Sequence, residues 1–233
     1  MKLERFERQI MLPEFGEKGQ AALASASVLI VGAGGLGAPA ALYLAAAGTG
    51  RIGIADGDRV ALSNLQRQVL YCESDIGRGK AGKAAERLSA LSSACTIIPY
   101  NYMLEKGNIE SIASDYDIIV DGCDNPDTRY LMDEVSKRLG KPYVYGAISG
   151  FEGQASLFNY LGGKGYEDLF PRHKRYGADT PPVTGVIGAL PGIIGSIEAM
   201  EAIKVAAGIG ETLRNRLLVV NALTMEFNTF SLD

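Results

Sequence analysis

Apolar residues recur along this chain in short, nearly uninterrupted runs, which are typical of strands buried on both faces of a sheet. Ala-rich or periodic segments lie between these runs and favour helices. The pattern predicts strands over residues 27–31, 51–55, 96–100, 116–120 and 142–147, and helices over residues 38–47, 80–91 and 127–139. Because strands alternate with helices, we expect an α/β fold, a Rossmann-like, mainly parallel sheet with helices on both faces.

The last part of the chain departs from this alternation. Residues 154–160 predict an extra strand that we expect to be antiparallel, and residues 217–221 and 225–230 predict the closing strands of an antiparallel C-terminal extension. Residues 188–207 have a helical pattern. Residues 161–182 combine glycine, proline and charge without a period, which predicts a long loop.

A glycine-rich motif lies between the first predicted strand and the first predicted helix. Residues 32–37 read GAGGLG and fit G-x-G-x-x-G, and Asp56 ends the next strand roughly 20 residues further on. Glycines let the backbone turn tightly and approach a phosphate, and an acidic residue at this spacing can bind ribose hydroxyls. The motif predicts a nucleotide site, with NAD and ATP both open, and a tight turn without a ligand is the alternative.

The distribution of charge favours a triphosphate over a dinucleotide. The chain carries a net charge of −4, which argues against general nucleic-acid binding. Residues 59–87 nevertheless hold six Arg or Lys against three Asp or Glu. Fixed cations of this kind stabilise the negative charge that develops during phosphoryl chemistry. A solvated, charged helix face is the structural alternative for each of these residues.

A second acidic segment, DGCDN over residues 121–125, follows the predicted strand 116–120. Ligands of open α/β sheets bind beyond the carboxyl ends of the strands, so Asp124 is expected to face the crevice of the glycine motif. A carboxylate beside a triphosphate is a natural ligand for Mg²⁺. Asp124 or Asn125 could instead cap the helix that starts after Pro126, and both roles are compatible.

Six motifs follow one another along the chain: RFERQIMLPEFGEKGQ, GAGGLG, DGDRVALSNLQRQ, DIGRGKA, DGCDNPDTR and GSIEAMEAIK. Together they resemble the MoeB/ThiF/HesA family of E1-like adenylating enzymes of the molybdopterin and thiamine pathways. The resemblance runs from Arg5 to Phe230 and implies an E1-like fold. We therefore expect one domain over residues 1–233, with a nucleotide-binding part (1–160), a mobile crossover loop (161–187) and a C-terminal helix with strands (188–233).

The resemblance also implies which residues bind ATP and Mg²⁺. Four glycines would cradle the nucleotide, one aspartate would hold the ribose and three further residues would contact the phosphates: Gly32, Gly34, Gly35 and Gly37, then Asp56, then Asn64, Arg67 and Lys80. The implied catalytic residues are Arg8, Arg67, Lys80 and Asp124. Asp124 would bind Mg²⁺, and Arg8 would reach into the site of a partner subunit, which requires a homodimer.

The implied reaction is adenylation of a ubiquitin-like sulfur-carrier protein that ends in Gly-Gly. The carrier's terminal carboxylate would attack the α-phosphate of ATP and release pyrophosphate. This carboxylate is already ionised near neutral pH, so no general base is needed, and the chain's only histidine, His173, is not required. The resemblance leaves open which carrier and which pathway are served.

The chain departs from the family at its cysteines. Many relatives bind a structural zinc through two CxxC pairs, but residues 164–169 read KGYEDL where the first pair would lie, so we expect no zinc. Cys72, Cys95 and Cys123 have no disulfide-like or metal-like spacing and are expected to be packed thiols. The sulfur would then come from a separate donor protein.

Two other functions compete with adenylation. An NAD-dependent oxidoreductase would need a hydride-transfer partner, and His173 has no evident companion. A non-catalytic E1-like scaffold subunit would have no need for the set Arg8, Asn64, Arg67, Lys80 and Asp124. The charged N-terminus lacks the apolar core of a signal peptide, and the least charged stretch, residues 181–197, is interrupted by prolines and glycines. We expect a cytoplasmic protein without a membrane span.

Overall fold

The structure, a computed structural model, describes residues 3–172 and 185–232. Its helices and strands are, in chain order, η1 (Leu3–Phe6), α1 (Glu7–Ile10), α2 (Gly16–Ser25), β1 (Ser27–Val31), α3 (Gly37–Ala47), β2 (Arg51–Ala55), η2 (Leu62–Asn64), η3 (Glu73–Asp75), α4 (Lys80–Leu91), β3 (Thr96–Tyr100), α5 (Ile109–Ser114), β4 (Ile118–Asp121), α6 (Pro126–Leu139), β5 (Tyr143–Ser149), β6 (Glu152–Phe158), α7 (Tyr166–Leu169), α8 (Ala189–Ala207), β7 (Arg216–Asn221) and β8 (Glu226–Ser231). None of the described helices is both long and apolar enough to span a bilayer.

The strands form one mixed sheet in the order β3-β2-β1-β4-β5-β6-β7-β8. The pairs from β3 to β5 are parallel, and the pairs from β5 to β8 are antiparallel. The predicted parallel sheet and its antiparallel C-terminal extension are thus confirmed. Strands β1, β2 and β4 end at the same edge, because Val31 pairs with Ala55 on one side and with Asp121 on the other.

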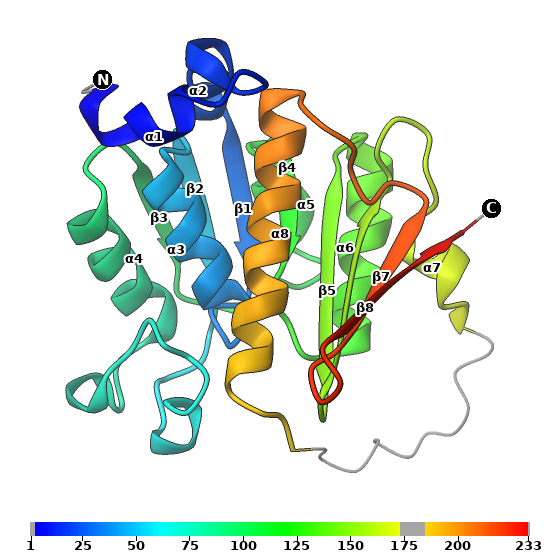
Figure 1. Cartoon of the computed structure of the whole chain (residues 1–233). Coiled ribbons are helices and arrows are strands. Elements are labelled where there is room, and N and C mark those ends of the chain that lie inside the picture. Colours follow the sequence, from blue (N-terminus) through cyan, green and yellow to red (C-terminus); the bar gives the residue numbers. More distant parts are fainter. Residues whose placement is uncertain (1–2, 173–184, 233) are drawn as a thin grey trace.

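Helices cover both faces of the sheet (Figure 1). Alternate residues of β1 divide between the two cores, as the two-residue period of a strand requires. Val28 and Ile30 belong to the core under α3, α4 and α8, whereas Leu29 and Val31 belong to the core under α5 and α6. The central parallel strands β1, β2 and β4 are therefore buried on both sides, which explains their nearly continuous apolar sequences.

The N-terminal helices α1 and α2 lie at the amino ends of the strands, at the top of Figure 1. They are held by the C-terminal end of α3, whose Ala47 carbonyl accepts hydrogen bonds from Gln9 (3.1 Å) and Gln20 (3.0 Å). The Phe6 ring is buried where it packs against Gly48. These helices are consequently at the opposite end of the sheet from the glycine motif.

The crossover loop predicted over residues 161–187 contains a short helix, α7. Asp133 of α6 accepts hydrogen bonds from the backbone N–H groups of Tyr166 (2.7 Å) and Glu167 (3.1 Å) and so caps this helix. The Tyr166 ring packs edge-on against Tyr130. Both contacts come from another element, which is why the sequence of the loop gives no helical period. His173 and the rest of residues 173–184 lie outside the described residues.

Candidate functional site

The glycine motif forms a tight turn between β1 and α3. Gly32 has a φ of 100°, in the left-handed region that favours glycine. A Cβ on Gly37 would lie 1.9 Å from the Gly32 carbonyl oxygen, so the turn closes on itself with no room for a side chain there. The turn leads into the N-terminus of α3, and Gly34 and Gly35 within it are partly exposed at the carboxyl edge, where a phosphate could approach the backbone.

Asp56 follows β2 and stabilises this turn. Its Oδ2 atom accepts a hydrogen bond from the Ala33 N–H (2.9 Å), and its Oδ1 atom accepts one from the Asp58 N–H (2.8 Å). Each carboxylate oxygen retains acceptor capacity after one hydrogen bond. Asp56 can therefore hold the turn and still accept hydrogen bonds from ribose hydroxyls.

The two predicted phosphate-binding cations lie beside the turn. Arg67 is half-buried, its Nη1 donates to the Ser63 carbonyl (3.2 Å), and its side chain passes next to Gly35. Lys80, the first residue of α4, is buried, and its ammonium group pairs with the Asp58 carboxylate at 2.9 Å. The Asp58 side chain is 56% exposed, so the buried Lys80 ammonium group pairs with a carboxylate that also contacts water.

Asn64 and Gln68 occupy different positions from those the motif implies. The Asn64 side chain accepts a hydrogen bond from the Ala61 N–H (3.1 Å), which closes its own turn, and Asn64 does not line the cavity described below. Gln68 does line the cavity; it is 4% exposed, and its Oε1 atom has no hydrogen-bond partner among the described residues. Gln68 thus brings an amide to the cavity wall, a position that the motifs did not single out.

The turn after β4 presents Asp124 at the same edge. Asp124 is exposed, whereas Asn125 caps α6 by accepting a hydrogen bond from the Thr128 N–H (2.9 Å). Of the two candidates for the helix cap, Asn125 therefore has that role, and its neighbour Asp124 does not. Asp124 is free of the capping role and can serve as a metal ligand.

A buried ion pair supports this turn from below. Arg129 is bound to Asp121 through Nε (3.0 Å) and donates from Nη2 to the Cys123 carbonyl (3.0 Å). The Cys123 N–H donates to the Asp121 carboxylate (3.0 Å), so both the N–H and the carbonyl of Cys123 are held by the ion pair. Burial alone would lower the pKa of Arg129, but the Asp121 carboxylate raises it, so the guanidinium remains charged.

Cys123 also lines the cavity, and its thiol is partly buried. Burial, reinforced by the Asp121 carboxylate, raises the pKa of Cys123 well above its ordinary value. The thiolate is the nucleophilic form of cysteine, so a neutral buried thiol is a poor attacking group. This agrees with the expectation that Cys123 is a packed side chain.

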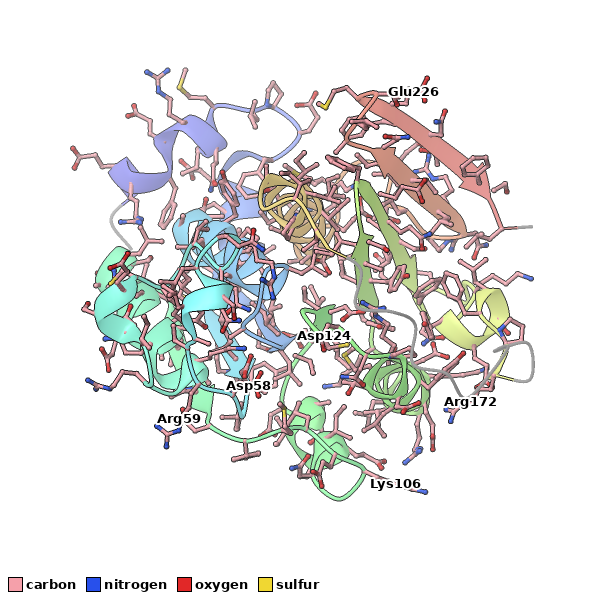
Figure 2. All side chains as sticks on the ribbon, turned by 90° about the horizontal axis from the view of Figure 1, so that it is seen from below. Asp58, Arg59, Lys106, Asp124, Arg172 and Glu226 are labelled. Carbon is pink, nitrogen blue, oxygen red and sulfur yellow. The ribbon has the colours of Figure 1, made fainter. Side chains whose placement is uncertain are left out.

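These segments surround a cavity of about 440 Å³, within the usual range for small-molecule sites. The predicted residues that line it are Gly32, Gly34, Gly35, Asp56, Arg67, Lys80 and Asp124. Gly37 and Asn64 are not among the residues that line the cavity. Figure 2 looks at this edge and shows Asp58 and Asp124 near its middle, whereas Glu226 lies at the far corner on β8.

Arg8 does not reach the cavity of its own chain. It is exposed on α1, which lies at the amino ends of the strands (Figure 1). The residues that line the cavity lie at the carboxyl ends of the strands. Any contact of Arg8 with such a site must therefore come from a second copy of the chain.

Other cavity residues were not singled out from the sequence. Asp58, Gln68 and Arg129 stand within the motifs, but no spacing rule separates them from their neighbours. Met103 and Leu104, in the segment after β3, give an apolar wall next to Ala55 that suits a flat base. Nothing in their local sequence marks them, because the pairing of β2 with β3 places them there.

A glycine turn, an acidic residue after the second strand and cations around one cavity define the class of Rossmann-like nucleotide-binding proteins. Within that class the chain belongs to the ThiF family, whose model matches residues 6–233. Solved structures with this fold include PaaA, with a TM-score of 0.85 and 21% identity, covering 99% of this chain and 73% of that one. A crystal structure of E. coli MccB with ATP has a TM-score of 0.76 and 21% identity, covering 92% and 65%.

Curated relatives are more similar in sequence. A sulfur carrier protein adenylyltransferase of Thermus thermophilus is 44% identical over 232 residues, which cover 97% of this chain and 86% of that protein. The adenylyltransferase and sulfurtransferase MOCS3-1 of Zea mays is 42% identical over 236 residues, covering 98% and 49%. The chain thus spans about half the length of the MOCS3 relatives that it matches.

Proposed function

We propose that this protein uses ATP to adenylate the C-terminal glycine carboxylate of a ubiquitin-like sulfur-carrier protein. The observation that carries the proposal is the convergence of the glycine turn, Arg67, Lys80 and Asp124 on one cavity. Three separate stretches of the chain supply these groups. Their convergence supports a binding site for a nucleoside triphosphate rather than a set of unrelated surface charges. The names of the ThiF-family relatives support the same chemistry.

The proposed reaction is a displacement at phosphorus. A carboxylate oxygen of the carrier attacks the α-phosphorus of ATP, the bond from that phosphorus to the bridging oxygen breaks, and pyrophosphate leaves with the electron pair. The attacking carboxylate is ionised already, so the protein needs no general base. Catalysis then consists of positioning and charge stabilisation, for which Arg67 and Lys80 are placed at the cavity wall.

The residues present fit a magnesium ion that is shared with the nucleotide. Asp124 offers an exposed carboxylate at the cavity. Within residues 3–172 and 185–232, no group of three or more His, Cys, Asp or Glu side chains is arranged as a metal cage. Mg²⁺ often binds through one carboxylate together with substrate phosphates, and it would neutralise phosphate charge there.

An apolar surface at the same edge of the sheet suits a protein substrate. Exposed apolar side chains stand on three neighbouring turns at the carboxyl edge: Phe151, Ile187, Leu223 and Met225. These turns are joined by hydrogen bonds from the Ala222 N–H to the Phe151 carbonyl (2.8 Å) and from the Ile187 N–H to the Gly150 carbonyl (3.4 Å). An apolar surface at the same edge of the sheet as a polar cavity is the arrangement expected where a carrier docks and extends its tail toward that cavity.

The remaining parts of the proposal concern assembly and setting. Arg8 would complete the site of a partner subunit, so the active form is a homodimer. We also propose a cytoplasmic enzyme without structural zinc that receives sulfur from a separate donor protein. The relatives' names point to molybdopterin and sulfur-carrier pathways, and thiamine biosynthesis belongs to the same proposal.

Trapping the acyl-adenylate tests the function. The protein is incubated with ATP, Mg²⁺, hydroxylamine and each of a panel of β-grasp carriers that end in Gly-Gly. We expect AMP release and a carrier hydroxamate with at least one carrier, and neither product with the same carrier lacking its last glycine. NADH binding, together with no release of AMP in the presence of any of the carriers, would support an oxidoreductase instead.

A further inference from the structure

Two parts of the proposed phosphate site come from separate stretches of the chain. The glycine turn follows β1, and Lys80 begins α4. Their distance from each other decides whether backbone N–H groups and the Lys80 ammonium can contact one phosphate chain together. A misplacement of about 1 Å can cost a hundredfold in rate at such a site.

Tyr71 lies between these two parts. It is 6% exposed, and its hydroxyl donates a hydrogen bond to the Ala33 carbonyl in the glycine turn (2.9 Å). The same hydroxyl makes a longer, shared contact with the Lys80 carbonyl at the start of α4 (3.3 Å). Tyr71 does not line the cavity, so it would act on a ligand only through the groups that it holds.

The environment of Tyr71 keeps its hydroxyl protonated. Burial raises the pKa of Tyr71, and the nearby Asp56 and Asp75 carboxylates raise it further. A phenol that stays protonated remains a hydrogen-bond donor, which two carbonyl acceptors require. The contact therefore persists across the pH range in which the protein would work.

Each of these two parts is also held by a side chain from the segment after β2. Asp56 holds the Ala33 N–H, and Asp58 holds the Lys80 ammonium. Both acids belong to the segment after β2, so the turn and the lysine are each tied to β2. Tyr71 instead contacts the glycine turn and the start of α4 with one hydroxyl, and so links these two parts directly.

We propose that Tyr71 is a positioning residue whose hydroxyl fixes the spacing between the glycine turn and Lys80. The inference rests on the proposed function, since it assumes that both parts hold the phosphates of ATP. A buried tyrosine hydroxyl that only stabilised the fold would affect stability but not the cooperation between Tyr71 and Lys80.

A double-mutant cycle separates these roles. Dissociation constants for Mg·ATP are measured by equilibrium dialysis for the full-length protein and for Tyr71→Phe, Lys80→Ala and the double variant. Phenylalanine keeps the ring packing and removes only the hydroxyl. We expect Tyr71→Phe to weaken binding roughly tenfold on its own and less than about twofold when Lys80 is already alanine.

Tyr130→Phe is the matched control. Tyr130 is also buried, and its hydroxyl donates to the Phe170 carbonyl (2.7 Å) outside the cavity. This variant should lose a comparable buried hydrogen bond and bind Mg·ATP as the unmodified protein does. An equal loss of affinity in Tyr130→Phe would show that Tyr71 acts through general stability.

The remaining outcomes are also decisive. The same weakening by Tyr71→Phe with and without Lys80, or no weakening at all, would overturn the positioning role while leaving ATP binding intact. An unmodified protein that does not bind Mg·ATP would overturn the proposed function itself, and the inference with it.

Discussion

At the scale of single residues, the turn that carries Asp124 is fixed before any ligand arrives. Asp121 accepts a hydrogen bond from the Cys123 N–H, and Arg129 donates to the Cys123 carbonyl. Asp124 is the next residue, so its backbone has little freedom. Preorganised polar groups of this kind need not reorganise during reaction, which is where electrostatic catalysis gains most.

Removing the Asp124 carboxylate should abolish Mg²⁺-dependent exchange between ATP and labelled pyrophosphate. We expect Asp124→Ala to lower the rate by at least about a hundredfold, because the metal loses its protein ligand. Glu134→Ala is the control, since this exposed glutamate lies on α6 and does not line the cavity. An unchanged exchange rate in Asp124→Ala would remove Asp124 from the site.

Gln68 should show opposite effects on stability and on binding. Its Oε1 atom is buried without a hydrogen-bond partner in the part of the chain that the structure describes, which is costly in the free protein. Gln68→Leu keeps a similar volume and should raise the melting temperature, while weakening Mg·ATP binding about two- to tenfold through a lost hydrogen bond. Thermal unfolding and dialysis check both effects. Equal or tighter ATP binding by Gln68→Leu would mean that the amide only fills space.

Residue types and spacing indicated most of the cavity but not its details. The glycine turn, Asp56, Arg67, Lys80 and Asp124 line it as the motifs led us to expect. That Gln68 rather than Asn64 lines the cavity depends on a local turn, which only three-dimensional structure fixes. The pairing of Lys80 with Asp58 likewise depends on where the two segments meet.

At the scale of elements, the sequence predicted every strand to within about two residues, because buried parallel strands have continuous apolar runs. It did not predict α5, which is only six residues long, or α7, which is capped by Asp133 of another helix. Short helices depend on tertiary contacts rather than on their own period. The apolar pattern did not predict the N-terminal helices α1 and α2 either.

The position of α1 predicts complementation between subunits. Arg8→Ala and Arg67→Ala should each be inactive alone, since every site then lacks one of its two arginines. Mixed dimers contain one site with both arginines, so mixing and reassociation should restore up to about a quarter of the activity if the variants pair at random. Pyrophosphate exchange before and after mixing measures this. No recovery in confirmed mixed dimers would count against a role in trans.

Helix α8 carries a buried carboxyl group that predicts a pH dependence of stability. Glu198 is fully buried, and both of its oxygens lack partners among the described residues. Burial raises the pKa of Glu198 well above its ordinary value, and the Asp121 carboxylate adds to this. The group is therefore protonated in the folded protein at pH values where it is ionised in the unfolded chain. Its contribution is intact at low pH and lost as the pH rises toward the folded pKa.

Glu198→Gln should remove this dependence. In the original protein, the Glu198 contribution to the free energy of unfolding should fall by up to about 1.4 kcal/mol per pH unit above the unfolded pKa. The variant should match it near pH 4 and be more stable at pH 8. Urea unfolding at both pH values gives the comparison. A variant less stable than the original at pH 8 would show that Glu198 is ionised and paired.

At the scale of the whole molecule, one sheet brings two features to the same edge. Its parallel half places the nucleotide cavity at the carboxyl edge, and its antiparallel half brings apolar turns to the same edge. The apolar pattern predicted both halves, but it could not show that the β5–β6 and β7–β8 turns lie at the same edge of the sheet as the cavity. Strand order and long-range pairing determine that arrangement.

The whole chain should also bind no structural zinc. Residues 164–169 form part of α7 and its approach, without cysteine. Protein purified without chelators should contain far less than one zinc per chain by elemental analysis, and EDTA should leave its melting temperature unchanged. One zinc per chain that is lost together with stability would contradict the expectation.

Carrier-dependent pyrophosphate exchange is the most direct test of the central claim. Labelled pyrophosphate is followed into ATP with Mg²⁺ and a Gly-Gly carrier, then with the carrier lacking its terminal glycine, and then with EDTA. We predict label in ATP only when the intact carrier and Mg²⁺ are both present. Exchange that is indifferent to the carrier's terminus, or absent with every Gly-Gly carrier, would contradict the account.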